Sequence, residues 1–76
     1  MTADQMKLRL ETAFNGARVA VFDLTGTQDH YQVVIDSNQL NGLRRIQQHQ
    51  AVMKVFDEEL KSGEIHALTI STKFED

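Results

Sequence analysis

The sequence contains no cysteine, proline or tryptophan among its 76 residues, and only four glycines. Without cysteine, the chain can form no disulfide, no catalytic thiolate and no thiolate metal site of its own. Secreted domains of this size usually depend on disulfides, so we expect an intracellular protein.

Long apolar runs are also absent. No run approaches the roughly 18 residues that a transmembrane helix requires. Residues 1–5 lack the basic and apolar regions of a signal peptide. We therefore expect no membrane association, a mature protein that comprises the whole chain, and a cytoplasmic location.

Neither sign of charge dominates. Eight Lys and Arg residues stand against eleven Asp and Glu residues, giving a net charge of −3 and no overall attraction to nucleic acid or anionic lipid. A chain of this length folds as one domain, which buries only about 60% of its unfolded surface. Because the sequence also lacks a glycine-rich phosphate loop and any serine at a suggestive spacing from a histidine, we expect a partner-assisted role rather than an enzyme.

The first predicted element is a helix. Thr2 and Gln5 have the spacing of a capping box, and Asn15-Gly16 is a typical helix stop. Leu8 falls off the apolar stripe and should be partly exposed. The stripe itself consists of Met6, Leu10, Ala13 and Phe14.

Two strands should follow as a hairpin. Residues 18–24 are almost continuously apolar and predict a strand with little exposed face, and residues 25–29 form a polar turn. Residues 30–36 alternate, with Tyr31, Val33 and Ile35 on one face. A short turn between two strands predicts antiparallel pairing.

The second half predicts helices and a last strand. Residues 37–42 have loop chemistry apart from Leu40, and helical character runs from Leu43 to about Ser62, with a bend suggested at residues 47–50. Gly63 should end the helix, and an apolar strand should open at His66. The order is then α-β-β-α-α-β. The helical stripe consists of Val52, Val55, Phe56 and Leu60.

Two histidines open two of the predicted strands. A strand-helix-strand crossover usually makes its strands parallel, so His30 and His66 would be neighbours if the third strand lies beside the second. Periodicity does not supply that strand order. Imidazole is a common metal ligand, but single histidines at such positions are more often structural, with His30 solvated and His66 bonded to a loop carbonyl.

Basic residues dominate one part of the chain. Between residues 37 and 56 the only charged residues are Arg44, Arg45 and Lys54, and His49 lies in the polar stretch at the predicted bend. These residues indicate either an ordinary solvated helix or a docking patch for an acidic protein surface or nucleic acid.

Several segments together resemble the BolA-like protein family, over residues 6–72 and in the family's order. The resemblance implies an α+β fold of the type II KH-like kind, α-β-β-α-α-β, with a three-stranded mixed sheet covered by helices, and a single BolA-like domain over residues 1–76. The segments are Asp23-Leu24-Thr25-Gly26, Asp29-His30-Tyr31-Gln32-Val33, Leu40-Asn41-Gly42, the run from Ile46 to Val52, and Ile65-His66-Ala67-Leu68.

The resemblance also implies a function. BolA-like proteins partner monothiol glutaredoxins and share a glutathione-ligated two-iron two-sulfur cluster with them. His66 matches the family's ligand histidine. The family's second ligand is a cysteine or histidine of the first hairpin, where this chain offers only His30. A chain without thiols cannot hold such a cluster alone, so we expect none in the isolated protein.

The resemblance leaves a second class of function open. The KH-like, helix-turn-helix arrangement also suggests a DNA-binding transcriptional regulator, in which Arg44 and Arg45 would contact phosphates and His49 and Lys54 would lie in the docking surface. The KH clamp loop, two glycines flanking two residues, is absent around Gly42. A homodimer is also compatible with the sequence.

Overall fold

Seven elements follow one another in the computed structural model, which describes residues 1–72. They confirm the predicted order, with one additional short helix. The elements are helix α1 (Ala3–Ala13), strands β1 (Arg18–Asp23) and β2 (His30–Asp36), helices α2 (Asn38–Asn41), α3 (Arg45–Val55) and α4 (Asp57–Ser62), and strand β3 (Ala67–Ser71).

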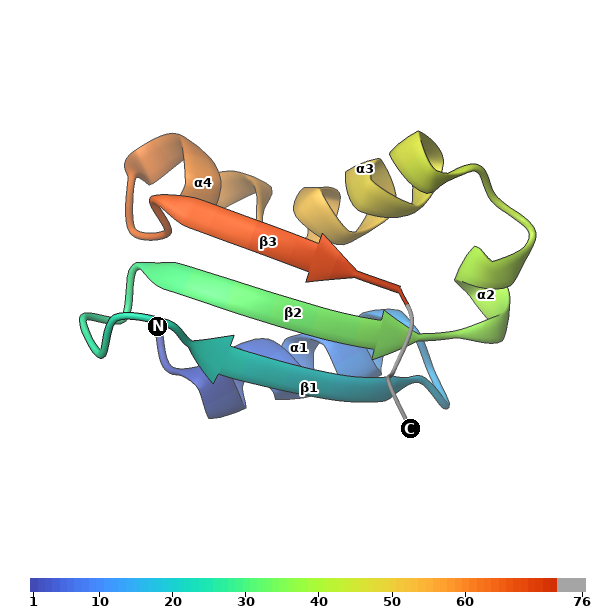
Figure 1. Ribbon diagram of the computed structural model, residues 1–76, viewed down its shortest axis with the longest axis horizontal. Helices are drawn as coiled ribbons and strands as arrows, with labels where there is room; N and C mark the ends of the chain where they lie inside the picture. The colour runs from blue at the N-terminus through green and yellow to red at the C-terminus, as the bar shows by residue number, and fades with distance from the viewer. Residues whose placement is uncertain (73–76) are drawn as a thin grey trace.

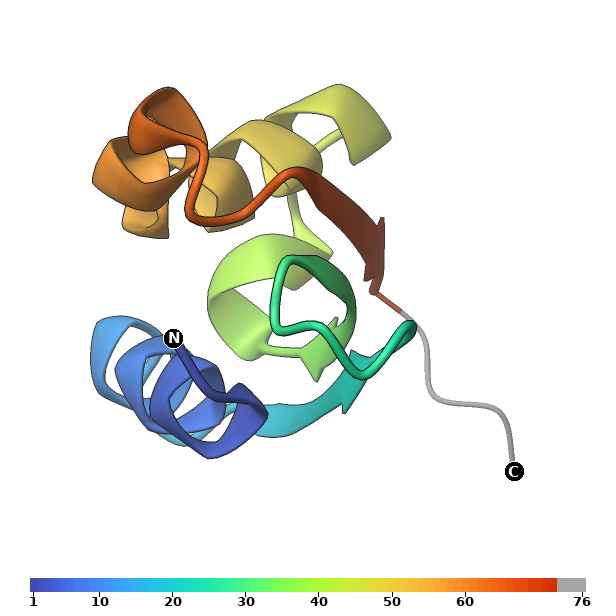
Figure 2. The same cartoon turned by 90° about the vertical axis from the view of Figure 1, so that its left-hand side faces the viewer.

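The three strands form a mixed sheet in the order β1-β2-β3 (Figure 1). β1 pairs with β2 antiparallel, and β2 pairs with β3 parallel. The helices gather on one side of the sheet, and within residues 1–72 no helix covers its other, open face (Figure 2). The α+β fold and the position of β3 beside β2 are therefore as predicted.

The core lies between this sheet and the helices. Tyr31, Val33 and Ile35 are fully buried on the predicted face of β2. Val52 and Phe56 from the predicted helical stripe are fully buried as well. Burying such a side chain contributes about 1.5–3 kcal/mol relative to leaving it exposed, so this contact holds the helices on the sheet.

The first helix begins and ends where its sequence predicts. The Thr2 hydroxyl accepts a hydrogen bond from the Gln5 amide at 3.1 Å, and the Gln5 side-chain oxygen accepts one from the Thr2 amide at 2.8 Å. Met6 and Leu10 are fully buried, whereas Leu8 is 65% exposed. The capping box is confirmed, and so is the apolar stripe apart from Ala13, which is exposed.

Two predictions between the hairpin and β3 are wrong. Residues 38–41 form α2 rather than a loop, because the Ser37 hydroxyl caps the Gln39 amide at 3.1 Å and Leu40 is buried. The helix break lies at Phe56 instead of residues 47–50. Glutamine is a good helix former, so the polar run continues α3, whereas Phe56 leaves helical geometry while its side chain is buried.

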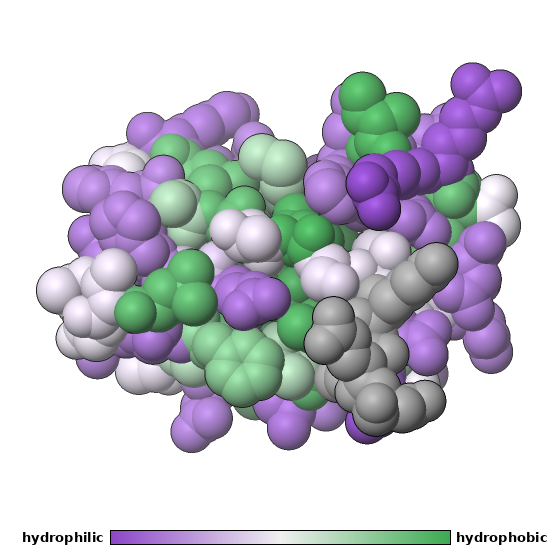
Figure 3. Space-filling model, in the orientation of Figure 1, coloured by the Kyte–Doolittle hydropathy of each residue, from purple (hydrophilic) through white to green (hydrophobic). Residues whose placement is uncertain are grey.

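The prediction that the first strand has little exposed face is also wrong. Val19 is buried, but Phe22 is 52% exposed on the open face of the sheet. Hydrophobic and hydrophilic residues are interspersed on that face (Figure 3). The apolar run of β1 therefore exceeds what the helices on the other side can cover.

Within residues 1–72, no helix combines the length and apolar character needed to cross a membrane.

Candidate metal centre

The parallel pairing of β2 with β3 brings two histidines together. His30 stands opposite Ala67 in the register, and His66 immediately precedes Ala67. The two imidazole rings lie edge to face, with centroids 6.0 Å apart and planes at 78°. The proximity that depended on strand order is confirmed.

The Asp29 carboxylate lies close to both imidazole rings. Its Oδ1 lies 2.8 Å from His30 Nδ1, and its Oδ2 lies 3.5 Å from His66 Nδ1. A hydrogen bond from the Thr27 hydroxyl, followed by the one from His30, lowers the pKa of Asp29 below its ordinary value. An ionised carboxylate can only accept, so His30 Nδ1 is the donor in this contact, and in the neutral ring Nε2 is then the nitrogen with a free lone pair.

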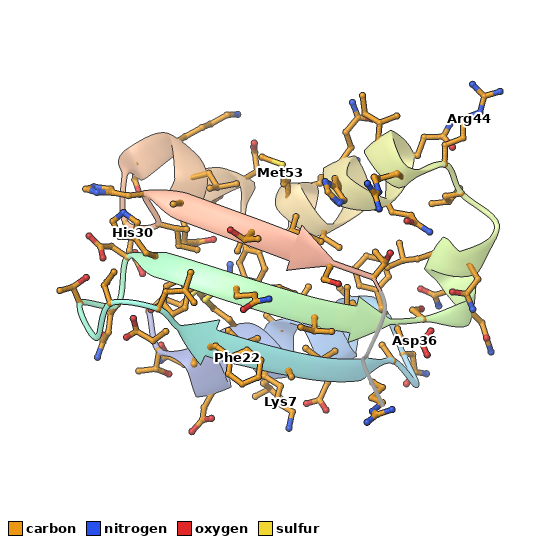
Figure 4. All side chains as sticks on the ribbon, viewed as in Figure 1. Lys7, Phe22, His30, Asp36, Arg44 and Met53 are labelled. Carbon is orange, nitrogen blue, oxygen red and sulfur yellow. The ribbon has the colours of Figure 1, made fainter. Side chains whose placement is uncertain are left out.

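Both rings are accessible from outside. The side chain of His66 is 61% exposed and that of His30 is 41% exposed. Figure 4 shows His30 at the start of β2, where the strand leaves the hairpin turn. A metal held by a visiting molecule can therefore reach these imidazoles without unfolding the domain.

His66 lies one residue before β3 rather than within it. It is exposed, whereas Leu68 and Ile70 pack against the core, so His66 does not share the environment of those two side chains. The reason is a shared acceptor: the amides of His66 and Ala67 both donate to the Asp29 carbonyl, at 2.8 and 3.1 Å. Two successive amides on one carbonyl interrupt the alternation of the strand.

The donor set at this site is small. Among residues 1–72, no group of three or more His, Cys, Asp and Glu side chains could hold a metal ion. His30 and His66 offer two imidazole nitrogens, a donor type that suits zinc, copper and iron. A metal at this edge would therefore take its remaining ligands from another molecule.

The predicted docking residues are distributed over two surface pockets and the segment before α3. Arg45 and His49 line a surface pocket of about 250 Å³ with the end of β3. Arg44 precedes α3 and lies at the opposite end of the molecule from His30 (Figure 4). Lys54 lines a separate pocket beside acidic residues of α4. His49 lies within α3 rather than at the predicted bend.

The sequence did not predict the contact between Asp29 and His66. The position of Asp29 next to His30 is visible in the sequence, and it indicates contact with that ring alone. Contact with His66, 37 positions later, requires the strand order and the shared carbonyl acceptor. No local pattern carries that information.

Comparison with known proteins agrees with the fold and the resemblance. The protein RP812 of Rickettsia prowazekii is 33% identical over 72 residues, which cover 95% of this chain and 92% of that protein. The structure of BolA1 from Arabidopsis thaliana superposes with a TM-score of 0.80 at 26% identity, covering 91% of this chain and 86% of that one. The BolA domain of SufE1 from the same plant gives 0.82 at 25% identity, covering 93% and 88%.

The sequence model described as BolA-like protein matches residues 4–76, which is nearly the whole chain. A match of this extent, together with the relatives and the fold, shows that the chain belongs to the BolA-like protein family.

Proposed function

We propose that this protein is an adaptor that binds a monothiol glutaredoxin and helps to ligate the glutathione-bound two-iron two-sulfur cluster of their complex. His66 is the principal ligand from this chain and His30 the second. The adaptor serves iron–sulfur trafficking or sensing and performs no catalysis of its own.

The observation that carries the proposal is the pair of accessible imidazoles at the end of the sheet where β2 and β3 begin. Their rings come from segments 36 positions apart and lie 6.0 Å from each other, outside the core. The Nδ1 atoms of both face the Asp29 carboxylate. A pair of structural histidines would more commonly be buried with both nitrogens engaged.

The donor set fits a shared cluster. Thiolates are the usual ligands of iron–sulfur clusters, and in one known class two histidines replace two of them. This chain has no cysteine, so the sulfur ligands must come from the partner and glutathione. Neutral imidazole in place of thiolate reduces the negative charge at iron and raises the reduction potential when the cluster is bound.

The test is the visible spectrum of the pair. The chain is co-expressed with a monothiol glutaredoxin and purified with glutathione, and the absorption and circular dichroism of the coloured complex are recorded. His66→Ala should change the spectrum of the complex while the far-ultraviolet signal of the free domain is retained. His49→Ala, which removes an imidazole from the other end of the molecule, is the matched control and should leave the spectrum unchanged.

An identical spectrum for wild type and His66→Ala would refute the ligand role of His66. A colourless mixture that contains both proteins would refute the partnership itself.

The distance of Arg44 from the histidine pair favours a second candidate function, nucleic-acid binding. Arg44 and Arg45 are exposed at the end of the molecule remote from the histidines, so a nucleic acid could bind there without touching the candidate centre. Such binding should weaken steeply with added salt. A salt-sensitive DNA shift that Arg44→Ala abolishes, without a coloured complex, would favour this regulator.

A further inference from the structure

We infer that Asp29 is a positioning residue that orients both imidazoles of the candidate centre. It holds the proton of each ring on Nδ1 and so leaves each Nε2 free for a metal. The inference rests on the proposed function for the identity of that metal, but the ring tautomers can be measured without any metal.

The Asp29 carboxylate lies close to both imidazoles. Its two oxygens face two different rings: Oδ1 is 2.8 Å from His30 Nδ1, and Oδ2 is 3.5 Å from His66 Nδ1. The Asp29 side chain is 27% exposed, so it is partly shielded from solvent. One acceptor thus makes a hydrogen bond with His30 and lies within ion-pair distance of His66, and both contacts favour the tautomer with the proton on Nδ1.

The backbone of Asp29 also contacts the segment that carries His66. The Asp29 carbonyl accepts from the amides of His66 and Ala67, which ties the start of β3 to the end of the hairpin turn. Asp29 therefore contacts His66 in two ways: the Asp29 carbonyl accepts from the His66 amide, and the Asp29 carboxylate lies near the His66 ring.

Hydrogen bonds within the hairpin turn hold the Asp29 carboxylate in place. The Thr27 hydroxyl donates to Asp29 Oδ1, and Thr25 Oγ1 lies 2.5 Å from Thr27 Oγ1. Asp23 accepts from the amides of Gly26 and Gln28, at 2.9 and 3.2 Å, which closes the turn beneath them. The turn is thus built to hold one carboxylate in a fixed place.

Metal-ligating histidines commonly donate their second ring nitrogen to a carboxylate, and loss of that partner weakens metal binding by about 10- to 100-fold. Such a carboxylate usually serves one histidine. Here one residue faces two rings, so a single substitution should disturb both potential ligands together.

The test begins with the free protein. Long-range ¹H–¹⁵N spectra at mildly alkaline pH, where free imidazole is neutral, report which ring nitrogen carries the proton. In the wild type, both His30 and His66 should be Nδ1-protonated. In Asp29→Asn, which keeps the backbone carbonyl, both rings should move toward the Nε2-protonated tautomer that unstructured histidine prefers.

Two controls accompany this variant. Asp36→Asn removes the same charge at the other end of β2 and should leave both tautomers unchanged (Figure 4). Thr27→Val removes the hydroxyl that supports the carboxylate and should shift both rings partway, which keeps the inference testable if Asp29→Asn does not fold.

The complex with glutaredoxin and glutathione provides the second readout. Asp29→Asn should lose the cluster to a chelator about 10- to 100-fold more readily than the wild type. Unchanged tautomers in Asp29→Asn, or in Thr27→Val where the first variant is unfolded, would overturn the positioning role. Shifted tautomers with no coloured complex even in the wild type would support Asp29 as the positioning residue and refute the proposed function instead.

Discussion

Three consecutive residues, Asp29, His30 and Tyr31, divide their side chains between the surface and the core. Asp29 accepts from the candidate ligand His30 on the open side of the sheet. Tyr31 points the other way, is fully buried, and donates its hydroxyl to the Met1 carbonyl. The two-residue period of the strand thus places the candidate ligand His30 next to the core residue Tyr31 in sequence.

Tyr31 predicts how the stability of the fold depends on alkaline pH. Burial first, and then the nearby charges of Asp23, Asp29 and Glu64, raise its pKa above the ordinary value. Above about pH 10 the unfolded chain loses the phenolic proton before the folded one does, so the unfolded state binds fewer protons. The free energy of unfolding should therefore be retained below about pH 10 and fall as the pH rises further.

Urea unfolding followed by circular dichroism at a series of pH values tests this, with Tyr31→Phe as the comparison. The variant should be about 1 kcal/mol less stable near neutral pH, because it lacks the hydrogen bond to Met1. Its free energy of unfolding should fall less steeply above pH 10. Parallel curves for the two proteins would show that Tyr31 does not cause the alkaline loss.

At the site, the sequence predicted the residues better than their contacts. His30 and His66 could be named from their places at the two strand starts, and their proximity followed once β3 lay beside β2. The Asp29 contact to His66 could not be predicted, because it depends on a carbonyl that two successive amides share.

Among the elements, helices α3 and α4 end in two different ways. Phe56 separates α3 from α4 while its ring remains in the core, and Gly63 ends α4 with a φ of 85°. That left-handed conformation turns the chain back toward the sheet. It sets the position of His66 three residues later, and a Cβ on Gly63 would lie 3.8 Å from His66 Nε2.

Gly63→Ala should destabilise the domain by about 1 kcal/mol, because a left-handed conformation costs an L-residue about 1–2 kcal/mol and the stiffer unfolded chain returns part of it. Gly42→Ala is the matched control, since Gly42 has a φ of −89° and an added Cβ would meet nothing within 4 Å. That control should be neutral or slightly stabilising. Urea midpoints measure both, and equal midpoints would contradict the role given to the Gly63 conformation.

Elements with strong local signals were predicted well and weakly specified ones were not. The capping box and stripe of α1 and the alternation of β2 define those elements by themselves. Helix α2 has only four residues, and its stability comes from the Ser37 cap and the burial of Leu40. The break at Phe56 likewise reflects packing against the core, which a glutamine-rich run does not reveal.

At the scale of the whole fold, the decisive feature is that the helices of residues 1–72 lie on one face of a three-stranded sheet (Figures 1 and 2). This arrangement leaves Phe22 exposed and places the histidine pair at one edge, with Arg44 at the opposite end. The order of elements and the mixed sheet followed from the sequence and its resemblance. The open face did not, because the apolar run of β1 looks like that of a strand covered on both sides.

The central claim is that this thiol-free chain provides imidazole nitrogen to iron whose sulfur ligands belong to other molecules. The most direct measurement is pulsed electron paramagnetic resonance of the reduced complex, with ¹⁵N-histidine in this chain and an unlabelled glutaredoxin. We predict a strong ¹⁵N hyperfine coupling from directly bound imidazole, which is lost or reduced in His66→Ala. A reduced cluster that shows no such ¹⁵N coupling in the wild-type complex would contradict the claim.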